Sequence, residues 1–556
     1  MDNTIFFTNR HRILETLRVN LQGILKGRGN NLALLGPRRI GKTMVLRKFL
    51  EGILQEEGVL PVYIHMEGMI ASPVFFALKY SASIINAYAM KIGIAMSDEA
   101  LLDPVFLASE AQKLKNSAIQ RVSKITLEEW ARTAQNEARL FQEAFELSEN
   151  LAQEEALRVI VILDEFQELK RLDGFPQIRD SLGLMRSITE RQIKTSYIVS
   201  GSLISLMEMM FKEGGQPFFA QFQIERIGSF TKEDSVELAT KIFHWEEVGF
   251  TDKVLDNVFQ LTMGHPFYVT VISERAAALS RRLGKKIDRS TVQRAFIEEV
   301  LNPDGRIYLI SDYIYRTSLA KVKGGLTLVT TLQALAHEDG LTMSEIARRI
   351  RKKTGEVNIY LKSLLESDLI IKGEDRYFFR DPVLKYWLAQ VALGKDTELT
   401  LRPVVLNDLI QELEERFHRA SSQLGIAVES QIREMMSKFK GQRVAGGLLG
   451  TNRTIVLPVF KEIKEYSSRN GNVQVDALAK NKETWAVEIK WSNRRSNKAD
   501  MARFYQSTSS LADRHWFISR SGFADAAVAF AREHDVYISS LPDLQKLAKI
   551  VKYRLQ

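Results

Sequence analysis

The chain has 556 residues, of which 45% are hydrophobic and 26% are charged. This is the composition of an ordinary globular protein, and the length suits roughly three or four domains of about 150 residues each. No apolar run approaches the ~18 residues that a membrane helix requires, and the first residues lack the basic-then-apolar layout of a signal peptide. We therefore expect a cytoplasmic protein with no membrane attachment.

The absence of cysteine excludes disulfides and zinc sites built from Cys. With eight histidines and no H-E-x-x-H pattern, a zinc enzyme is not expected. The net charge of +9 is unevenly distributed, since residues 411–556 hold 24 Lys and Arg against 16 Asp and Glu. A localised positive field suits a polyanionic partner such as DNA, although a solvated basic surface would give the same count.

Residues 1–225 alternate short apolar runs with helical stretches. Such alternation predicts βαβ units and a parallel sheet covered by helices on both faces. The strands are expected at Leu32–Leu35, Pro61–His65, Val159–Leu163 and Tyr197–Ser200. The fold class is therefore α/β, with residues 1–225 as its first domain.

Three further regions differ from the first in their pattern. Residues 226–320 show mostly helical periodicity and are expected to form a helical lid. Residues 321–395 predict a small helical module that ends in a hairpin. A polar stretch near residues 395–400 then leads to a last α/β region, 405–556.

A glycine-rich segment follows the first predicted strand and opens a helix expected at Met44–Leu54. It fits the pattern G-x-x-x-x-G-K-[ST] of a P-loop and consists of Gly36, Pro37, Arg38, Arg39, Ile40, Gly41, Lys42 and Thr43. Backbone N–H groups in such a loop surround phosphates, and the helix N-terminus adds its dipole. Lys42 is expected to reach the β and γ phosphates of ATP, and the Thr43 hydroxyl to bind Mg²⁺.

Two carboxylates end the apolar strand that begins at Arg158. The carboxyl edge of a parallel sheet is where ligands bind, so Asp164 and Glu165 are expected to face the P-loop. Asp164 is placed to hold the Mg²⁺ shell, and Glu165 to orient or deprotonate the attacking water. The alternative is a strand that simply ends in a solvated acidic turn.

The first 270 residues resemble the archaeal-type ATPases of the STAND class, which are relatives of the AAA+ proteins. The motifs that carry this resemblance are Phe7-Thr-Asn-Arg10, the P-loop with its Pro-Arg-Arg, Asp164-Glu-Phe-Gln167, Ser200-Gly-Ser202 and Gly264-His-Pro266. The resemblance implies that Arg10 lies near the adenine, that Ser200–Ser202 forms a polar sensor and that His265 senses phosphate. Each minor motif also has a simpler reading, as a surface charge or a turn before a helix.

One departure from that family concerns an arginine near the γ-phosphate. Family members tend to carry a Gly-Arg pair after the sensor strand, where this chain has Ala220-Gln221. Arg226 lies five residues further on and is the candidate substitute. Without such an arginine hydrolysis would be slow, because its contribution to the rate can reach ~10³–10⁵.

Residues 321–395 have the layout of a winged helix-turn-helix. Thr342 and Glu345 have the spacing of a capping box at a helix start, and a hairpin is expected around Gly373. Between the two helices lie five basic residues, Arg348, Arg349, Arg351, Lys352 and Lys353. They predict contact with DNA phosphates, unless the module is an interaction arm of the ATPase with solvated charges.

Residues 473–492 predict a hairpin around the turn Asn481-Lys482-Glu483. A three-residue loop would set Asp476 opposite Glu488 and Gln474 opposite Lys490, with Asp476, Glu488 and Lys490 on one face. The other face would be a core of Val473, Val475, Ala477, Ala479, Trp485, Val487, Ile489 and Trp491. Adjacent carboxylates repel unless a cation lies between them, so the hairpin predicts a metal site.

The order Asp476, Glu488, Lys490 resembles the PD-(D/E)xK nuclease fold, over about residues 425–520. The resemblance implies that Asp476 and Glu488 bind a metal, that Lys490 helps activate water, and that Glu429 joins the metal ligands. It also implies a role for Gln506 on the following helix. The alternative is a charged hairpin face, or a site that binds DNA without cutting it.

Taken together, the sequence predicts an ATP- and Mg²⁺-dependent ATPase joined to a DNA-directed nuclease-like domain, in a chain that can form homo-oligomers. Catalytic roles are expected for Glu165, Asp476, Glu488 and Lys490. Metal ligands are expected at Thr43, Asp164, Glu429, Asp476 and Glu488. Two other functions fit the same patterns: an ATP-dependent DNA-binding switch that does not cleave, and a signalling scaffold that binds proteins.

Overall fold

The computed structural model describes residues 6–212, 216, 218–320, 325–338, 340–373, 375–391, 428–468, 474–491 and 495–553. The chain divides into two compact units, Met1–Gly228 and Ser229–Gln556. The predicted polar stretch near residues 395–400 lies outside the described residues. No helix in the described part of the chain combines the length and the apolarity that a membrane crossing requires.

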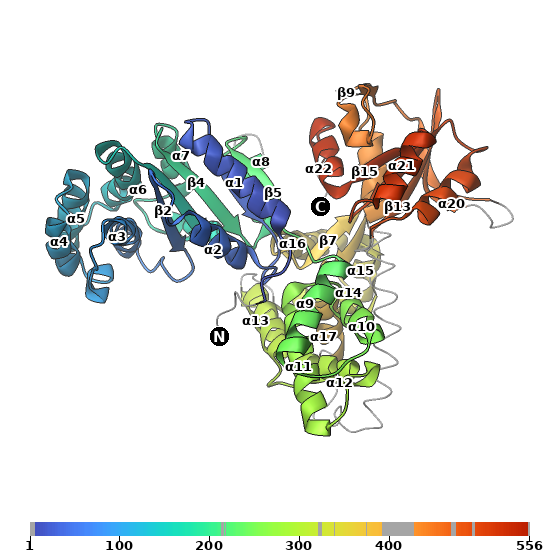
Figure 1. The fold of residues 1–556 in the computed structure, drawn as a ribbon, viewed down its shortest axis with the longest axis horizontal. Helices are drawn as coiled ribbons and strands as arrows, with labels where there is room; N and C mark the ends of the chain where they lie inside the picture. Colours follow the sequence, from blue (N-terminus) through green and yellow to red (C-terminus); the bar gives the residue numbers. More distant parts are fainter. Residues whose placement is uncertain are drawn as a thin grey trace. The chain divides into compact units, whose positions relative to one another are not determined.

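The first unit is built on a parallel five-stranded sheet with the order β2-β3-β4-β1-β5 (Figure 1). The strands are β1 (Asn31–Leu35), β2 (Val59–His65), β3 (Arg158–Asp164), β4 (Thr195–Gly201) and β5 (Phe222–Arg226). The four predicted strands and the predicted parallel sheet are confirmed. Because β4 lies between β1 and β3, the polar end of β4 is inserted between the P-loop and the acidic strand end.

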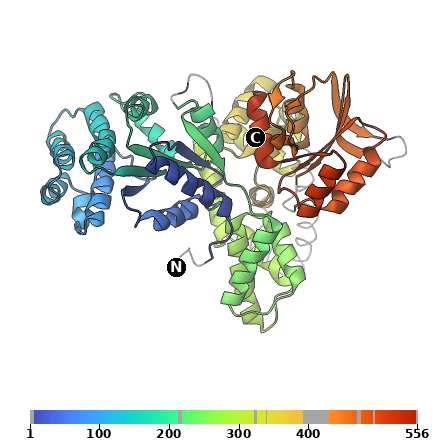
Figure 2. The same ribbon diagram turned by 45° about the horizontal axis from the view of Figure 1, so that its top comes forward.

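Helices cover both faces of this sheet, as the continuous apolar strands require. The helices are α1 (His11–Leu25), α2 (Lys42–Ile53), α3 (Pro73–Lys91), α4 (Pro104–Lys113), α5 (Ser117–Trp130), α6 (Glu137–Glu154), α7 (Ser181–Thr189) and α8 (Ile204–Lys212), with 3₁₀ turns η1 (Asp98–Leu101) and η2 (Phe166–Gly174). One core joins α1 and α2 to the sheet, and a second core joins α3, α6 and α7 to its other face. Figure 2 shows the sheet between these layers.

The second unit begins with the helices that were predicted as a lid. They are α9 (Lys232–Trp245), α10 (Asp252–Thr262), α11 (Pro266–Leu283), α12 (Arg289–Leu301) and α13 (Arg306–Ala320). Thr231 and Asp234 form a capping box at the start of α9, and Pro266 occupies the first turn of α11, where its missing N–H is not needed.

A small module follows, with α14 (Gly325–His337), β6 (Leu341–Thr342), α15 (Met343–Arg349), α16 (Thr354–Glu366), β7 (Ile370–Gly373), β8 (Arg376–Phe379) and α17 (Pro382–Val391). The predicted capping box is present, since Thr342 accepts from the Glu345 amide and Glu345 accepts from the Thr342 amide. The three short strands pair in the order β6-β8-β7. Helix, turn, helix and hairpin thus follow in the order expected of a winged helix.

The C-terminal region forms a mixed sheet with the order β11-β12-β13-β14-β15. Its elements are a helix over residues 428–437, β9 (Arg443–Val444), η3 (Gly446–Leu449), β10 (Ile455–Val456), β11 (Glu462–Ser467), β12 (Gln474–Lys480), β13 (Thr484–Lys490), α20 (Lys498–Thr508), β14 (Arg514–Ser519), α21 (Asp525–Glu533), β15 (Tyr537–Ser540) and α22 (Leu541–Ile550). The helix over 428–437 and α22 pack on one face, and α20 and α21 pack on the other. The α/β fold class is confirmed here too.

The β12–β13 hairpin has the register that the three-residue loop predicts, from Ala477–Val487 to Lys480–Thr484. For the residues of β12 that precede Ala477, the predicted pairing with β13 is wrong. Because β12 carries a bulge opposite Glu465, Asp476–Glu488 and Gln474–Lys490 are not ladder pairs. Val475 consequently packs with Leu478 on the α20 face, although it was expected beside Ala477. Val473 and Ser492 lie outside the described residues.

Candidate functional sites

The P-loop connects β1 to α2 and has the tight backbone that its glycines allow. Gly41 has φ of 98°, a left-handed conformation that favours glycine, and a Cβ on Gly36 would come within 2.5 Å of the Ile227 carbonyl oxygen. Arg10, which precedes α1, donates from Nη2 to the Ile40 carbonyl at 3.0 Å. The structure thus brings the predicted loop and the predicted Arg10 together.

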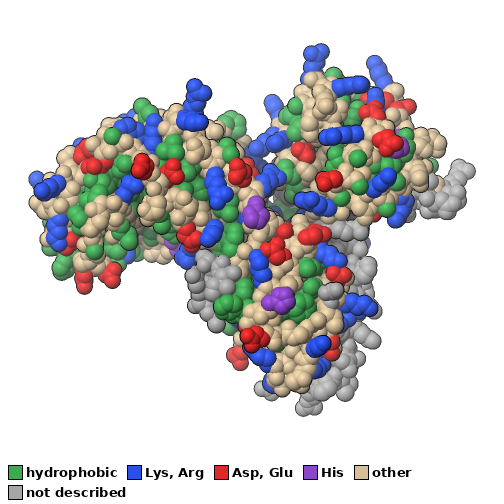
Figure 3. Space-filling model, viewed as in Figure 1, with side chains coloured by type: hydrophobic (Ala, Val, Ile, Leu, Met, Phe, Trp, Pro, Cys, Tyr) green, Lys and Arg blue, Asp and Glu red, His purple; other side chains and the backbone are tan. Residues whose placement is uncertain are grey.

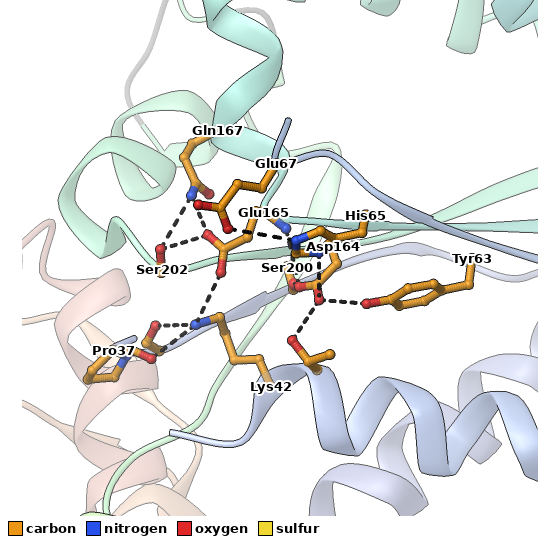
Figure 4. A network of polar contacts seen from close by, with 12 residues as sticks. Pro37, Lys42, Tyr63, His65, Glu67, Asp164, Glu165, Gln167, Ser200 and Ser202 are labelled. Atoms are coloured by element: carbon orange, nitrogen blue, oxygen red, sulfur yellow. Dashed lines mark hydrogen bonds and ion pairs between the residues drawn. The ribbon is translucent and has the colours of Figure 1, made fainter. Parts of the chain in front are cut away.

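Lys42 is buried inside the P-loop (Figure 4). Its Nζ donates to the carbonyl oxygens of Gly36 and Pro37, at 3.0 Å each, and lies 4.0 Å from Glu165 Oε1. Burial lowers the pKa of Lys42, while Glu165 and Asp164 oppose that shift. A buried ammonium that is held by carbonyl oxygens is positioned to exchange them for phosphate oxygens.

Asp164 lies at the end of β3 and accepts from several hydroxyl groups. Thr43 Oγ1 lies 2.6 Å and the Tyr63 hydroxyl 2.8 Å from Oδ2, and Ser200 donates to Oδ1. Burial raises the pKa of Asp164, but these hydrogen bonds outweigh burial and hold it below its usual value. The carboxylate is therefore ionised and fixed next to Thr43, as a metal ligand should be.

Glu165 is held by a separate set of contacts. Its backbone has φ of 57°, a strained conformation for a residue other than glycine, which directs the side chain toward Lys42. Ser202 donates to Oε2 at 2.7 Å, and Gln167 donates to the same oxygen. Figure 4 shows the side chains of Glu165, Gln167 and Ser202 converging at this edge of the sheet. The predicted sensor segment thus contacts both carboxylates, through Ser200 and Ser202.

Sequence reasoning missed Tyr63 and His65. Both lie on β2, which pairs with β3 so that His65 is level with Asp164. His65 Nδ1 lies 3.5 Å from Asp164 Oδ2, and its Nε2 lies 3.7 Å from Glu67. The sequence did show a polar residue, His65, at the end of the predicted strand Pro61–His65. Placing it beside Asp164 would have required knowing that β2 pairs with β3.

Two predicted residues of the ATPase site are engaged elsewhere or lie in the other unit. Arg226 ends β5 and forms an ion pair with Glu208 of α8. His265 precedes α11 in the second unit, where its ring centroid lies 4.5 Å from that of Tyr268. The roles of Arg226 and His265 toward phosphate stay predictions.

The second site lies where β12 and β13 separate. Asp476 Oδ2 accepts from the Ile489 amide at 2.6 Å, and Lys490 Nζ donates to Glu488 Oε1. Burial raises the pKa of Asp476 to about 7, with further contributions from Glu488 and Glu429. The structure therefore gathers Asp476, Glu488, Lys490 and Glu429 within electrostatic reach of one another, as predicted.

Charge in this second site is not balanced. Burial raises the pKa of Glu429; the nearby Arg433 opposes that shift, and Glu465 and Glu488 add to it. Burial alone would lower the pKa of Lys490, but its ion pair with Glu488 raises it. Two cationic groups, the Lys490 ammonium and the Arg433 guanidinium, thus face a larger number of carboxylates, a surplus that suits a divalent cation with oxygen ligands. No three His, Cys, Asp or Glu side chains in the described part of the chain are arranged to hold a metal ion.

Gln506 does not join this group. Its side chain is exposed on α20 and has no hydrogen bond to Asp476, Glu488 or Lys490 within the described residues. Asp500, in the first turn of α20, is the residue of that helix whose charge raises the pKa of Lys490. Gln506 lies six residues further along, about 9 Å at 1.5 Å per residue. Its predicted role stays a prediction without a supporting contact.

Comparisons with known proteins match two parts of the chain. Residues 7–272 match the family model of an ATPase domain predominantly from Archaea, and residues 460–551 match a restriction endonuclease family. No curated protein sequence matches the chain.

Three solved structures illustrate the similarity. A Walker-type ATPase of Pyrococcus abyssi is 18% identical, with 69% of this chain and 96% of that chain covered and a TM-score of 0.49. The ORC2 protein of Aeropyrum pernix is 14% identical, with 74% and 98% covered and a TM-score of 0.45. Cdc6p of Pyrobaculum aerophilum is 15% identical, with 74% and 98% covered and a TM-score of 0.35.

The two family matches coincide with the two sites. The ATPase match contains the P-loop and the carboxylates of Asp164 and Glu165, and the endonuclease match contains Asp476, Glu488 and Lys490. The chain therefore joins an archaeal-type P-loop ATPase domain to a restriction-endonuclease domain of the PD-(D/E)xK kind.

Proposed function

We propose that the chain is a STAND-type ATPase that binds and hydrolyses ATP with Mg²⁺ and uses its nucleotide state to control DNA cleavage by its C-terminal domain. The observation that carries the proposal is the pair of carboxylate sites. In the first site, Asp164 accepts a hydrogen bond from Thr43 of the P-loop. In the second site, Glu488 accepts one from Lys490, within the region that matches the endonuclease family.

In the ATPase site, P-loop amides and Lys42 would bind the triphosphate, with Lys42 leaving the carbonyls of Gly36 and Pro37. Thr43 and Asp164 would hold Mg²⁺, which supplies charge neutralisation at the β and γ phosphates. Glu165, oriented by Ser202 and Gln167, would position the attacking water. Arg10 would lie at the base side of the nucleotide, and His265 is the candidate phosphate sensor of the helical lid.

Hydrolysis is expected to be slow. Arg226 is paired with Glu208, so the first unit offers this candidate arginine only at the cost of that ion pair. A second copy of the chain could supply an arginine instead, which would make hydrolysis depend on assembly. Slow hydrolysis suits a switch that holds ATP for long periods.

In the nuclease site, Asp476 and Glu488, with Glu429, would hold a divalent ion. When bound, such an ion would supply Lewis-acid activation of water and of the phosphate. Lys490 would orient that water and stabilise the negative charge that develops on the phosphodiester. For this role Lys490 would have to release Glu488, with which it forms an ion pair, and Glu488 would then be available as a metal ligand.

DNA would be bound through phosphates by the C-terminal region and the winged-helix module. Lys and Arg side chains protrude from the C-terminal domain, with acidic side chains among them (Figure 3). The five basic residues of the winged helix lie in the last turn of α15 and in the segment before α16, and they include Arg351, whose φ of 54° turns the chain sharply there. Each phosphate contact would add to the salt dependence of binding.

The test is cleavage of a supercoiled plasmid with Mg²⁺ or Mn²⁺, with and without ATP, by the wild type, Lys42→Ala and Asp476→Asn. We expect cleavage by the wild type, none by Asp476→Asn, and an altered ATP dependence in Lys42→Ala. Equal cleavage by the wild type and Lys42→Ala under both conditions would refute nucleotide control.

A second candidate function is a DNA-binding switch that does not cleave. The lack of a three-residue metal cluster among the described side chains favours it. Salt-sensitive DNA binding without cleavage in either metal would establish it. If the protein failed to bind DNA at any salt concentration, a protein-binding scaffold would be favoured instead.

A further inference from the structure

Strand β12 contains a bulge at the first residue of the nuclease site. Lys464 of β11 pairs with Leu478, but Tyr466 pairs with Val475, so two residues of β12 stand opposite Glu465 alone. The two bulged residues are Asp476 and Ala477. Bulges next to active sites change the direction of a side chain and interrupt the regular ladder.

Both the backbone and the side chain of Asp476 make contacts beyond the β11–β12 ladder. Its carbonyl oxygen accepts from Arg433 Nη1 at 2.7 Å. Its carboxylate accepts from the Ile489 amide at 2.6 Å. Asp476 therefore bridges β13 on one side and the helix over residues 428–437 on the other.

Arg433 and Glu429 lie four residues apart on that helix, and therefore on the same face. Both side chains are half-buried, while Val428, Ile432 and Met435 anchor the helix in the core. The helix that carries Glu429 is thus tied to the bulge by Arg433.

We propose that Arg433 is a positioning residue of the nuclease site, which holds the bulge open at the Asp476 carbonyl and thereby aims the Asp476 carboxylate at β13 beside Glu488. The inference rests on the proposed nuclease function only for its consequence, which is metal binding. Without Arg433, the bulged carbonyl would lose this donor and the bulge could relax toward regular pairing. The carboxylate would then leave the Ile489 amide and the group formed with Glu429 and Glu488.

The primary experiment is residue-resolved amide hydrogen exchange on the full chain. It compares the wild type with Arg433→Met, Arg433→Lys and a control, Arg514→Met, which removes a surface arginine paired with Asp535 in the same domain. The reporter is the Ile489 amide, and the reference is Val487, which stands opposite Ala477 inside the ladder.

We expect Arg433→Met to accelerate exchange at Ile489 by about tenfold or more with Val487 unchanged, since loss of one local bond opens one amide. Arg433→Lys should be intermediate, and Arg514→Met should match the wild type. An unchanged exchange rate at Ile489 in Arg433→Met would overturn the proposal. Equal acceleration at Ile489 and Val487 would overturn it too, because it would show that Arg433 stabilises the domain as a whole.

Calorimetric titration with Mn²⁺ provides the second readout. Arg433→Met should weaken Mn²⁺ binding by about tenfold, and Arg514→Met should not. If the wild type binds Mn²⁺ but never cuts DNA, the proposed nuclease fails while the exchange result still decides the role of Arg433. If the wild type cuts DNA and Arg433→Met binds Mn²⁺ as the wild type does, the proposal for Arg433 fails and the nuclease stands.

Discussion

The two carboxylates that lead each site, Asp164 and Asp476, have opposite surroundings. Hydroxyl groups of Thr43, Tyr63 and Ser200 surround Asp164, and they keep its pKa low in spite of burial. Asp476 accepts from one backbone amide and faces other carboxylates, and its pKa rises to about 7. The difference teaches that protein hydroxyl groups compensate the buried charge of Asp164, whereas burial and neighbouring carboxylates disfavour the charge of Asp476; under the proposed function a cation would supply the missing compensation.

The largest expected effect that would test this comparison comes from Asp476→Asn. The change removes the charge but keeps the shape, so the ion should bind poorly and cleavage should fall by about 10³-fold, equal to about 4 kcal/mol of transition-state stabilisation. The ATPase rate should be unchanged. Single-turnover cleavage and steady-state ATP hydrolysis measure the two activities, and cleavage at the wild-type rate would refute the role of Asp476.

Glu165→Gln should be next in size. The glutamine still fits between Ser202 and Gln167 but cannot accept a proton, so hydrolysis should fall by about 10²-fold, the lower end of the range for a general base. ATP affinity should stay near that of the wild type because Lys42 and the loop amides are intact. Measurement of nucleotide affinity and turnover separates the two, and a parallel loss of affinity would show that Glu165 is a binding residue.

A stability measurement would sharpen the contrast between the sites. In EDTA at pH 8, Asp476→Asn should stabilise the protein by about 1–3 kcal/mol, since a raised pKa means that the ionised group costs stability there. The gain should shrink as the pH falls below about 7, where Asp476 takes up its proton. Asp164→Asn should instead destabilise, because a lowered pKa contributes stability above the unfolded value of about 3.9.

Thermal unfolding at pH 8 and pH 5 measures both effects. The wild type is the reference, and Asp535→Asn, at an exposed surface position, is a control for loss of a carboxylate. Stabilisation by Asp164→Asn at pH 8 would break the comparison, because it would mean that the hydroxyl groups do not compensate for burial.

The smallest expected effect is that of Tyr63→Phe. It removes one hydroxyl from Asp164 and leaves those of Thr43 and Ser200, a loss of about 1.5 kcal/mol or tenfold for a bond to a charged group. The Mg²⁺ concentration for half-maximal ATPase activity should rise accordingly. Equal Mg²⁺ dependence in the variant and the wild type would show that Tyr63 does not position Asp164.

Much of the ATPase site was predictable from the sequence because its chemistry is local. The P-loop is one continuous segment, and the ends of parallel strands meet at one edge, which brought Asp164, Glu165, Ser200 and Thr43 together. Tyr63 and His65 were missed because their role depends on β2 lying next to β3, and strand order is set by packing across the whole sheet. The pairing of Arg226 with Glu208 likewise depends on where α8 packs.

The nuclease site was predictable only in part. The short loop determined the hairpin register up to Ala477, since a turn of fixed length leaves few alternatives. The bulge at Asp476 was not predictable, because it is defined by the register of β12 against β11, which lies outside the hairpin, and the loop length does not constrain that pairing. For the same reason Val475 was assigned to the wrong face.

The central claim is that the chain has two separate metal sites, one at the P-loop and one at Asp476. Anomalous diffraction from crystals soaked with Mn²⁺ and a non-hydrolysable ATP analogue tests it most directly. The account predicts one manganese peak between Thr43 and Asp164, next to the phosphates, and a second between Asp476 and Glu488. A peak at the P-loop with none at Asp476 under saturating Mn²⁺ would contradict it.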